Sequence, residues 1–171
     1  MTEYEKQLLD LYCGGEIALE KFQLVFPIEL ETSSENLFEA VKLITATKDA
    51  GKIDRLITLI FTFDDLDIHV EALNNLLVTP HHFFHQAIAK SLQNIASPTT
   101  VPFVKQVLEM GFDFLEYTCS ESETIGKWLS WVLYRIGTPE AIAVIKEYTE
   151  SEDEGLAKAM QYRLAKVEAD N

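Results

Sequence analysis

His81, His82 and His85 stand close together in the sequence and are the first candidates for chemistry. His81 and His85 have the i, i+4 spacing that places two side chains on one face of a helix, where they could chelate a metal ion. The zinc-protease pattern requires a glutamate directly after its first histidine, and this chain has His82 at that position. Because no third ligand is within reach by sequence, we expect a solvated helix start and no metal site.

The remaining residue patterns give no sign of an enzyme. A carboxylate that works as a general acid or base needs burial or a matched partner to shift its pKa, and no single carboxylate stands out in so acidic a chain. The seven glycines form no phosphate-binding loop, and neither serine nor cysteine stands in a recognisable nucleophile motif. We therefore expect a non-enzymatic protein with no catalytic residue and no cofactor.

The charge balance limits the choice of partner. The 171 residues include 14 basic and 28 acidic side chains, which gives a formal net charge of −14. Such a surface repels phosphate backbones, so direct nucleic-acid binding is not expected and a basic protein is the natural partner. Solubility alone is the other explanation of the acidic excess, and the sequence leaves both open.

The chain lacks the segments of a membrane or secreted protein. No apolar run approaches the roughly 20 residues of a membrane span, and the first residues lack the basic and then apolar layout of a signal peptide. Cys13 and Cys119 are too few for a disulfide framework, so we expect both to be reduced. These observations predict a soluble cytoplasmic protein with no membrane partner.

An internal repeat with an offset of 41 residues predicts the architecture. Ile95-Ala96-Ser97-Pro98 aligns with Ile136-Gly137-Thr138-Pro139, and the apolar positions on either side align as well. Each Ser/Thr-Pro pair suits a helix start, because the hydroxyl caps the helix and proline is tolerated at the first helical position. The aligned pairs are Ile88 with Leu129, Leu92 with Leu133, Val101 with Ile142, Val104 with Ile145 and Lys105 with Lys146.

Other helix starts are predicted from local motifs. Thr79-Pro80 repeats the Ser/Thr-Pro mark, and the capping-box pattern S/T-x-x-E occurs at Thr32, Ser120 and Ser151. The predicted single all-α domain has helical hairpins over 32–63, 80–111 and 120–150. N-terminal capping helices over 1–31, the second ended by Pro27, precede the hairpins, and a C-terminal helix over 152–168 follows them.

The repeated hairpin, with its Ser/Thr-Pro turn and its second helix of the form x-A-I-x-V-I-K-E, resembles HEAT and HEAT-like repeats. The resemblance covers about residues 80–150 and implies a short α-solenoid of stacked helical hairpins. HEAT motifs are degenerate, so the resemblance indicates a fold and no particular activity.

The acidic residues that follow the hairpins indicate where a partner binds. In a stack of hairpins the loops between repeats fall along one edge, and they would form an acidic ridge there. Trp131 aligns with Lys90, an outward position of the sister repeat, and an exposed tryptophan is a typical hot spot. The predicted partner-binding residues are Asp64, Asp65, Asp67, Asp113, Glu116, Glu121, Trp131, Glu150, Glu152 and Asp153.

In size, repeat type and charge the chain resembles the HEAT-like, all-helical immunity proteins of bacterial contact-dependent and other polymorphic toxin systems, some of which block RNA-cleaving toxins of the EndoU type. The resemblance implies that this chain neutralises a basic nuclease toxin by covering its active site with the acidic surface. The alternative is a general HEAT-like adaptor whose partner is not a toxin.

Overall fold

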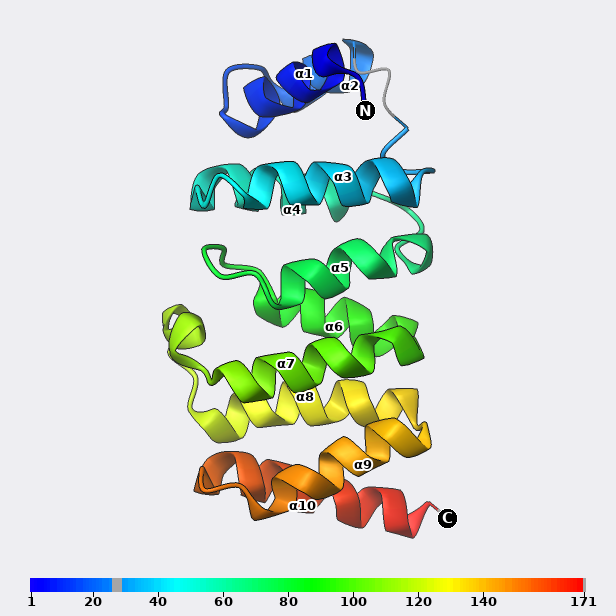
Figure 1. Cartoon of the computed structure of the whole chain (residues 1–171), viewed down its shortest axis with the longest axis vertical. Coiled ribbons are helices and arrows are strands. Elements are labelled where there is room, and N and C mark those ends of the chain that lie inside the picture. The colour runs from blue at the N-terminus through cyan, green and yellow to red at the C-terminus, as the bar shows by residue number, and fades with distance from the viewer. Residues whose placement is uncertain (26–28, 171) are drawn as a thin grey trace. The chain divides into compact units, whose positions relative to one another are not determined.

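Every regular element in residues 1–25 and 29–170, the part of the chain that this computed structural model describes, is a helix (Figure 1). The all-α prediction is therefore confirmed. The chain divides into two compact units, residues 1–84 (unit 1) and 85–171 (unit 2). The division falls inside the predicted hairpin 80–111, whose first helix begins at His85 and not after Thr79-Pro80.

Unit 1 contains the predicted N-terminal helices and the first hairpin. The central helix α3 packs against α1, α4 and α5, and buried leucines and isoleucines fill the space between them. The predicted end of α2 at Pro27 lies outside the described residues. The helices of this unit are α1 (Glu3–Cys13), α2 (Leu19–Val25), α3 (Ser34–Thr45), α4 (Ala50–Ile60), the 3-10 helix η1 (Asp67–His69) and α5 (Val70–Leu77).

Unit 2 is organised around one helix. Helix α8 packs against α6, α7, α9 and α10, which makes it the centre of the unit. The helices are α6 (His85–Ile95), η2 (Pro98–Thr100), α7 (Val101–Met110), η3 (Asp113–Thr118), α8 (Ser122–Ile136), α9 (Pro139–Glu147), η4 (Tyr148–Glu150) and α10 (Glu154–Ala169). Helices α6 and α7 lie within the predicted hairpin 80–111, and α8 and α9 lie within the predicted hairpin 120–150. Helix α10 overlaps the predicted C-terminal helix 152–168.

Burial within unit 2 agrees with the 41-residue register at most of the aligned apolar pairs. Leu92 and Leu133 are both completely buried, and so are Val104 and Ile145. The two Ser/Thr-Pro marks also act as predicted: the hydroxyl of Ser97 accepts a hydrogen bond from Thr99 N–H, and that of Thr138 accepts one from Ala141 N–H. Equal spacing thus corresponds to equal burial at these pairs, whereas Val101 is buried and its aligned residue Ile142 is only half-buried.

The three predicted capping boxes are wrong, each by one to two residues. Helix α3 is capped by Ser33 instead of Thr32, α8 by the backbone of Glu121 instead of Ser120, and α10 by Asp153 instead of Ser151. In each case a neighbouring residue with the required extended backbone takes the capping position. A capping box does occur at Thr2 and Glu5, where α1 begins.

Both cysteines are free thiols, as predicted, but their environments differ. Cys13 is buried in unit 1, and this burial raises the pKa of its thiol to about 12. Cys119 is exposed and follows η3. None of the helices in the described residues combines the length and the apolar character needed to cross a lipid bilayer.

Candidate partner-binding surfaces

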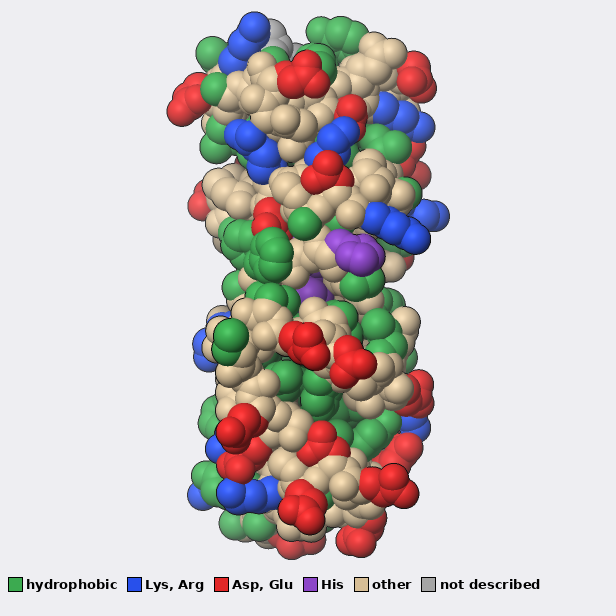
Figure 2. Space-filling view, turned by 90° about the vertical axis from the view of Figure 1, so that its left-hand side faces the viewer, with side chains coloured by type: hydrophobic (Ala, Val, Ile, Leu, Met, Phe, Trp, Pro, Cys, Tyr) green, Lys and Arg blue, Asp and Glu red, His purple; other side chains and the backbone are tan. Residues whose placement is uncertain are grey.

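An acidic groove lies in unit 2, where the segments that follow α7 and α9 meet the starts of α8 and α10. Its volume is about 370 Å³. Asp113, Glu116 and Asp153 line it, and the other lining side chains include Leu108, Phe112, Ile125 and Leu156. Figure 2 shows acidic side chains gathered around hydrophobic ones on the part of this face that unit 2 forms. No lysine or arginine lines the groove, so its charge is negative.

The three carboxylates of the acidic groove are not equivalent. Asp153 is occupied, because it caps α10 through Leu156 N–H at 2.9 Å and accepts a hydrogen bond from the hydroxyl of Ser122 at 2.7 Å. Asp113 and Glu116, in η3, are exposed, and within the described part of the chain neither forms an ion pair. Asp113 and Glu116 are therefore the carboxylates available to a cationic partner.

The other predicted acidic residues are all exposed, but they do not line this groove. Glu121 is the N-terminal cap residue of α8, Glu150 ends η4, and Glu152 precedes α10. Asp64, Asp65 and Asp67 belong to unit 1, where Asp65 Oδ1 accepts a hydrogen bond from the backbone N–H of Asp67 at 2.9 Å. A continuous ridge through both units stays a prediction.

Trp131 lies in a different groove of unit 2, between α8 and α10. It is 38% exposed, in agreement with the predicted outward position. This second groove, about 540 Å³ in volume, has cationic and aromatic side chains in its wall, and we call it the basic-aromatic groove. Its lining residues are Lys127, Trp128, Trp131, Lys158, Tyr162 and Arg163, together with Gln93 and Glu123.

Sequence reasoning missed the cations of this groove. A signal was present: Lys127 and Trp131 on α8, and Lys158 and Tyr162 on α10, each have the i, i+4 spacing of helix neighbours. The convergence of the two helices was not visible in the sequence. Trp131 and the acidic groove thus belong to separate surfaces, because Trp131 does not line the acidic groove.

No family model, curated protein or solved structure matches this chain. The features that bear on function are therefore the two grooves of unit 2. The acidic groove contains a hydroxyl–carboxylate pair, Ser122 and Asp153, and the carboxylate of this pair also caps α10.

Glu123 links α8 to α10 at the edge of the basic-aromatic groove. Its carboxylate accepts hydrogen bonds from Lys127 Nζ at 2.6 Å and Lys158 Nζ at 2.8 Å. The hydrogen bonds from Lys127 and Lys158 lower the pKa of Glu123 from 4.5 to about 2. A group whose pKa falls on folding stabilises the folded state above its unfolded-state pKa, and that stabilisation is lost as the pH falls toward the folded-state pKa.

We expect Glu123→Gln to lower the free energy of unfolding at neutral pH, because the ion pairs to Lys127 and Lys158 are lost. The difference from the parent protein should shrink as the pH falls from about 4.5 to about 2, where Glu123 becomes protonated in the folded state as well. Urea unfolding at a series of pH values measures this difference. A difference that stayed constant over this range would show that the ion pairs do not stabilise the fold.

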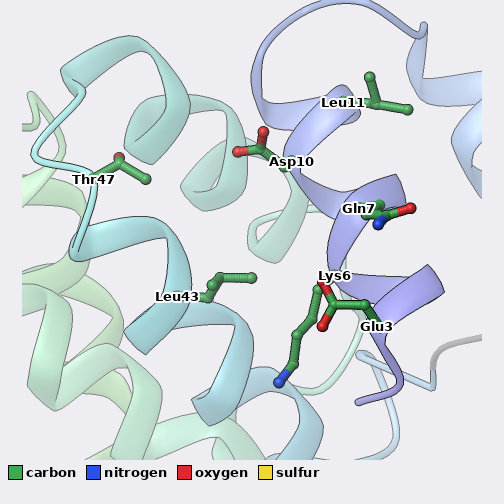
Figure 3. A pocket seen from close by; sticks show the side chains of 7 residues that line it. All are labelled: Glu3, Lys6, Gln7, Asp10, Leu11, Leu43 and Thr47. Atoms are coloured by element: carbon green, nitrogen blue, oxygen red, sulfur yellow. The ribbon is translucent and has the colours of Figure 1, made fainter.

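Unit 1 has a pocket of about 580 Å³ between α1 and α3, lined by Glu3, Lys6, Gln7, Asp10, Leu11, Leu43 and Thr47 (Figure 3). The charged groups most suited to a ligand are already paired within the unit. Lys6 Nζ lies 2.9 Å from Glu39, and Asp10 lies 2.5 Å from Lys52 Nζ. This pocket is therefore a weaker candidate than either groove of unit 2.

The predicted solvated helix start is wrong, because two of its three histidines, His82 and His85, are buried. His82 Nε2 lies 2.8 Å from the carbonyl oxygen of Leu76, and burial lowers the pKa of His82. His85 is also buried, with Nδ1 3.0 Å from the hydroxyl of Tyr117. His81 is exposed, and the described residues include no cluster of three metal-ligating side chains. His81 and His85 do not share a helix, because α6 begins at His85.

Proposed function

We propose that this chain is an immunity protein that binds and neutralises a basic toxin, most simply a nuclease of the EndoU type, through the acidic groove of unit 2. The observation that carries the proposal is the groove itself, where Asp113 and Glu116 stand without ion pairs beside apolar side chains. Apolar contact supplies affinity, and carboxylates of opposite sign to the partner supply orientation and fast association.

The proposed fold supports the same conclusion. We infer a HEAT-like arrangement from the 41-residue repeat, because three of its aligned pairs, Ile88 with Leu129, Leu92 with Leu133 and Val104 with Ile145, are buried alike in unit 2. Repeat proteins of this kind present loops and helix faces as extended binding surfaces. Nuclease toxins need a basic active site to hold RNA, so an acidic groove that covers this site would exclude the substrate.

A test begins with the protein encoded next to the gene of this chain. We expect its purified toxin domain to cleave RNA, and we expect an equimolar amount of this chain to stop the cleavage. Reversal of Asp113 and Glu116 to lysine should weaken binding by about tenfold or more, because each substitution places a cation against a basic partner. Neither residue caps an α-helix, so the fold should be retained.

Glu168→Lys is the matched control. It makes the same change in charge as either reversal made singly, on an exposed carboxylate of unit 2, but it lies in the last turn of α10, far from Asp153 at the start of that helix. If Glu168→Lys weakened binding as much as the reversals in the groove, the loss of affinity would come from net charge alone and not from the acidic groove. Binding that is insensitive to salt and to both substitutions would favour the general adaptor, and a neighbouring protein without toxic activity would contradict the immunity function.

A further inference from the structure

Arg163 in α10 is a buried cation, and no anion in the described part of the chain compensates its charge. Its residue is 4% exposed, and its Nε atom has no hydrogen-bond partner within residues 1–25 and 29–170. No described carboxylate lies within ion-pair distance of it. A buried charge is ordinarily paired, because removal of an ion from water is expensive. The wall of the basic-aromatic groove therefore contains an arginine that no anion of the described residues pairs with.

Aromatic rings hold the Arg163 guanidinium in place. Its central carbon lies 4.0 Å from the ring centroid of Trp131 and 5.2 Å from that of Tyr134. Ring stacking uses the face of the guanidinium, whereas its N–H groups donate in the plane. The rings therefore hold the guanidinium in the wall of the groove, and a guanidinium has the N–H groups that bind a planar anion in bidentate fashion.

The local charge of this groove is opposite to that of the chain as a whole. Lys127, Lys158 and Arg163 face a single carboxylate, Glu123, so the lining residues have a formal charge of +2 in a chain of −14. Glu123 already engages both lysines. Arg163 is consequently the one cation of the lining whose charge no carboxylate of the described chain neutralises.

We propose that the basic-aromatic groove binds a small aromatic carboxylate, with the carboxylate on Arg163 and the ring against Trp128, Trp131 and Tyr162. The groove volume of about 540 Å³ lies in the range of small-molecule sites, which combine aromatic walls with a few polar groups. The proposal is independent of the proposed immunity function, because the two grooves share no lining residue.

A carboxylate fits this groove better than a phosphate. One guanidinium edge matches the two oxygens of one carboxylate. A phosphate carries more charge and would need further free donors, but Lys127 and Lys158 are held by Glu123 at 2.6 and 2.8 Å. The Glu123 carboxylate would also repel the additional negative charge. The single uncompensated arginine thus selects a singly charged, planar acid.

Tryptophan fluorescence reports on this groove directly, because both tryptophans of the chain, Trp128 and Trp131, line it. At constant ionic strength we expect phenylacetate to change the fluorescence in a saturable manner. Phenylacetamide has the same ring without the charge and should bind about tenfold more weakly, the loss expected for one charge-assisted contact. Equal binding of acid and amide by the unmodified protein would overturn the proposal, and so would tighter binding of acetate or adenosine monophosphate.

Two arginine variants complete the test. Arg163→Met should abolish the preference for phenylacetate over phenylacetamide, whereas Arg135→Met, which removes an exposed arginine of α8 outside the groove, should retain it. Loss of the preference in both variants would contradict the assignment. If Arg163→Met does not fold, Arg163→Lys is the alternative, because lysine keeps the charge but lacks the planar guanidinium. This variant should still bind phenylacetate with a smaller preference over phenylacetamide than the unmodified protein shows.

A carboxylate close to an aromatic ring occurs both in free aromatic acids and at the C-terminus of a polypeptide that ends in an aromatic residue. The peptide Gly-Gly-Phe with a free terminal carboxylate tests the second source against phenylacetate. Weaker binding of the peptide would assign the groove to a free acid, and tighter binding would assign it to a protein terminus. In both cases the amidated peptide should bind no better than phenylacetamide, because the carboxylate is required.

Discussion

Leu92→Ala and Leu133→Ala should each lower the free energy of unfolding by about 2–5 kcal/mol. Both side chains are completely buried in unit 2, Leu92 on α6 and Leu133 on α8, so truncation loses apolar burial and leaves a cavity in each case. Because the two leucines occupy the same position of the 41-residue repeat, their costs should also be similar to each other.

Urea unfolding followed by far-UV circular dichroism and by tryptophan fluorescence measures these costs, and the fluorescence reports unit 2 alone because both tryptophans lie there. Lys90→Ala is the control, since Lys90 is exposed on α6 and should change stability by no more than about 0.5 kcal/mol. A cost for either leucine as small as that of Lys90 would contradict the equivalence of the repeats.

The repeat could be predicted from the sequence because it depends on local periodicity. Apolar residues three and four positions apart identify the buried face of a helix, and Ser97-Pro98 and Thr138-Pro139 mark where helices begin. Thr79-Pro80 failed as a helix start. The hydroxyl of Thr79 instead donates to the carbonyl oxygen of Asn75 at the end of α5, so it closes one helix rather than opening the next.

The capping boxes could not be assigned because several capping side chains stand next to one another. Thr32 is followed by Ser33, and Asp153 stands two residues after Ser151, and each alternative can accept a hydrogen bond from an unpaired N–H group. Which residue caps depends on where the backbone becomes extended. That in turn is set by packing against other helices, which a local pattern does not contain.

The candidate site was predicted only in part for a similar reason. Exposure of Asp113, Glu116 and Trp131 follows from their places after or on a helix, and the structure confirms it. Arg163 was missed because α10 meets α8 through tertiary contacts, and nothing in its own sequence neighbourhood shows that Trp131 lies 4.0 Å away. The sequence also did not show that Trp131 and the acidic groove lie on separate surfaces, because this too depends on how α8 and α10 pack together.

Gly155→Ala should lower the free energy of unfolding by about 1–3 kcal/mol, although alanine is the better helix former. A Cβ atom at residue 155 would lie 2.8 Å from the backbone nitrogen of Glu123 and would also collide with the hydroxyl of Ser122. The backbone at the start of α8 cannot move aside without disturbing the packing of α8 on α10. The close approach of these helices therefore requires glycine at this position.

Gly51→Ala provides a closely matched comparison and should have the opposite sign. Gly51 and Gly155 both stand two residues after an aspartate that caps a helix, Asp49 on α4 and Asp153 on α10. Around Gly51 a Cβ atom would meet only the carboxylate of Asp49, at 3.3 Å, so alanine should raise the free energy of unfolding by about 0.5–1 kcal/mol through lower entropy of the unfolded chain. Thermal unfolding followed by circular dichroism compares the two variants. Because their local helix positions are alike, a stabilising effect of alanine at both would show that the contact between the starts of α8 and α10 is looser than 2.8 Å implies.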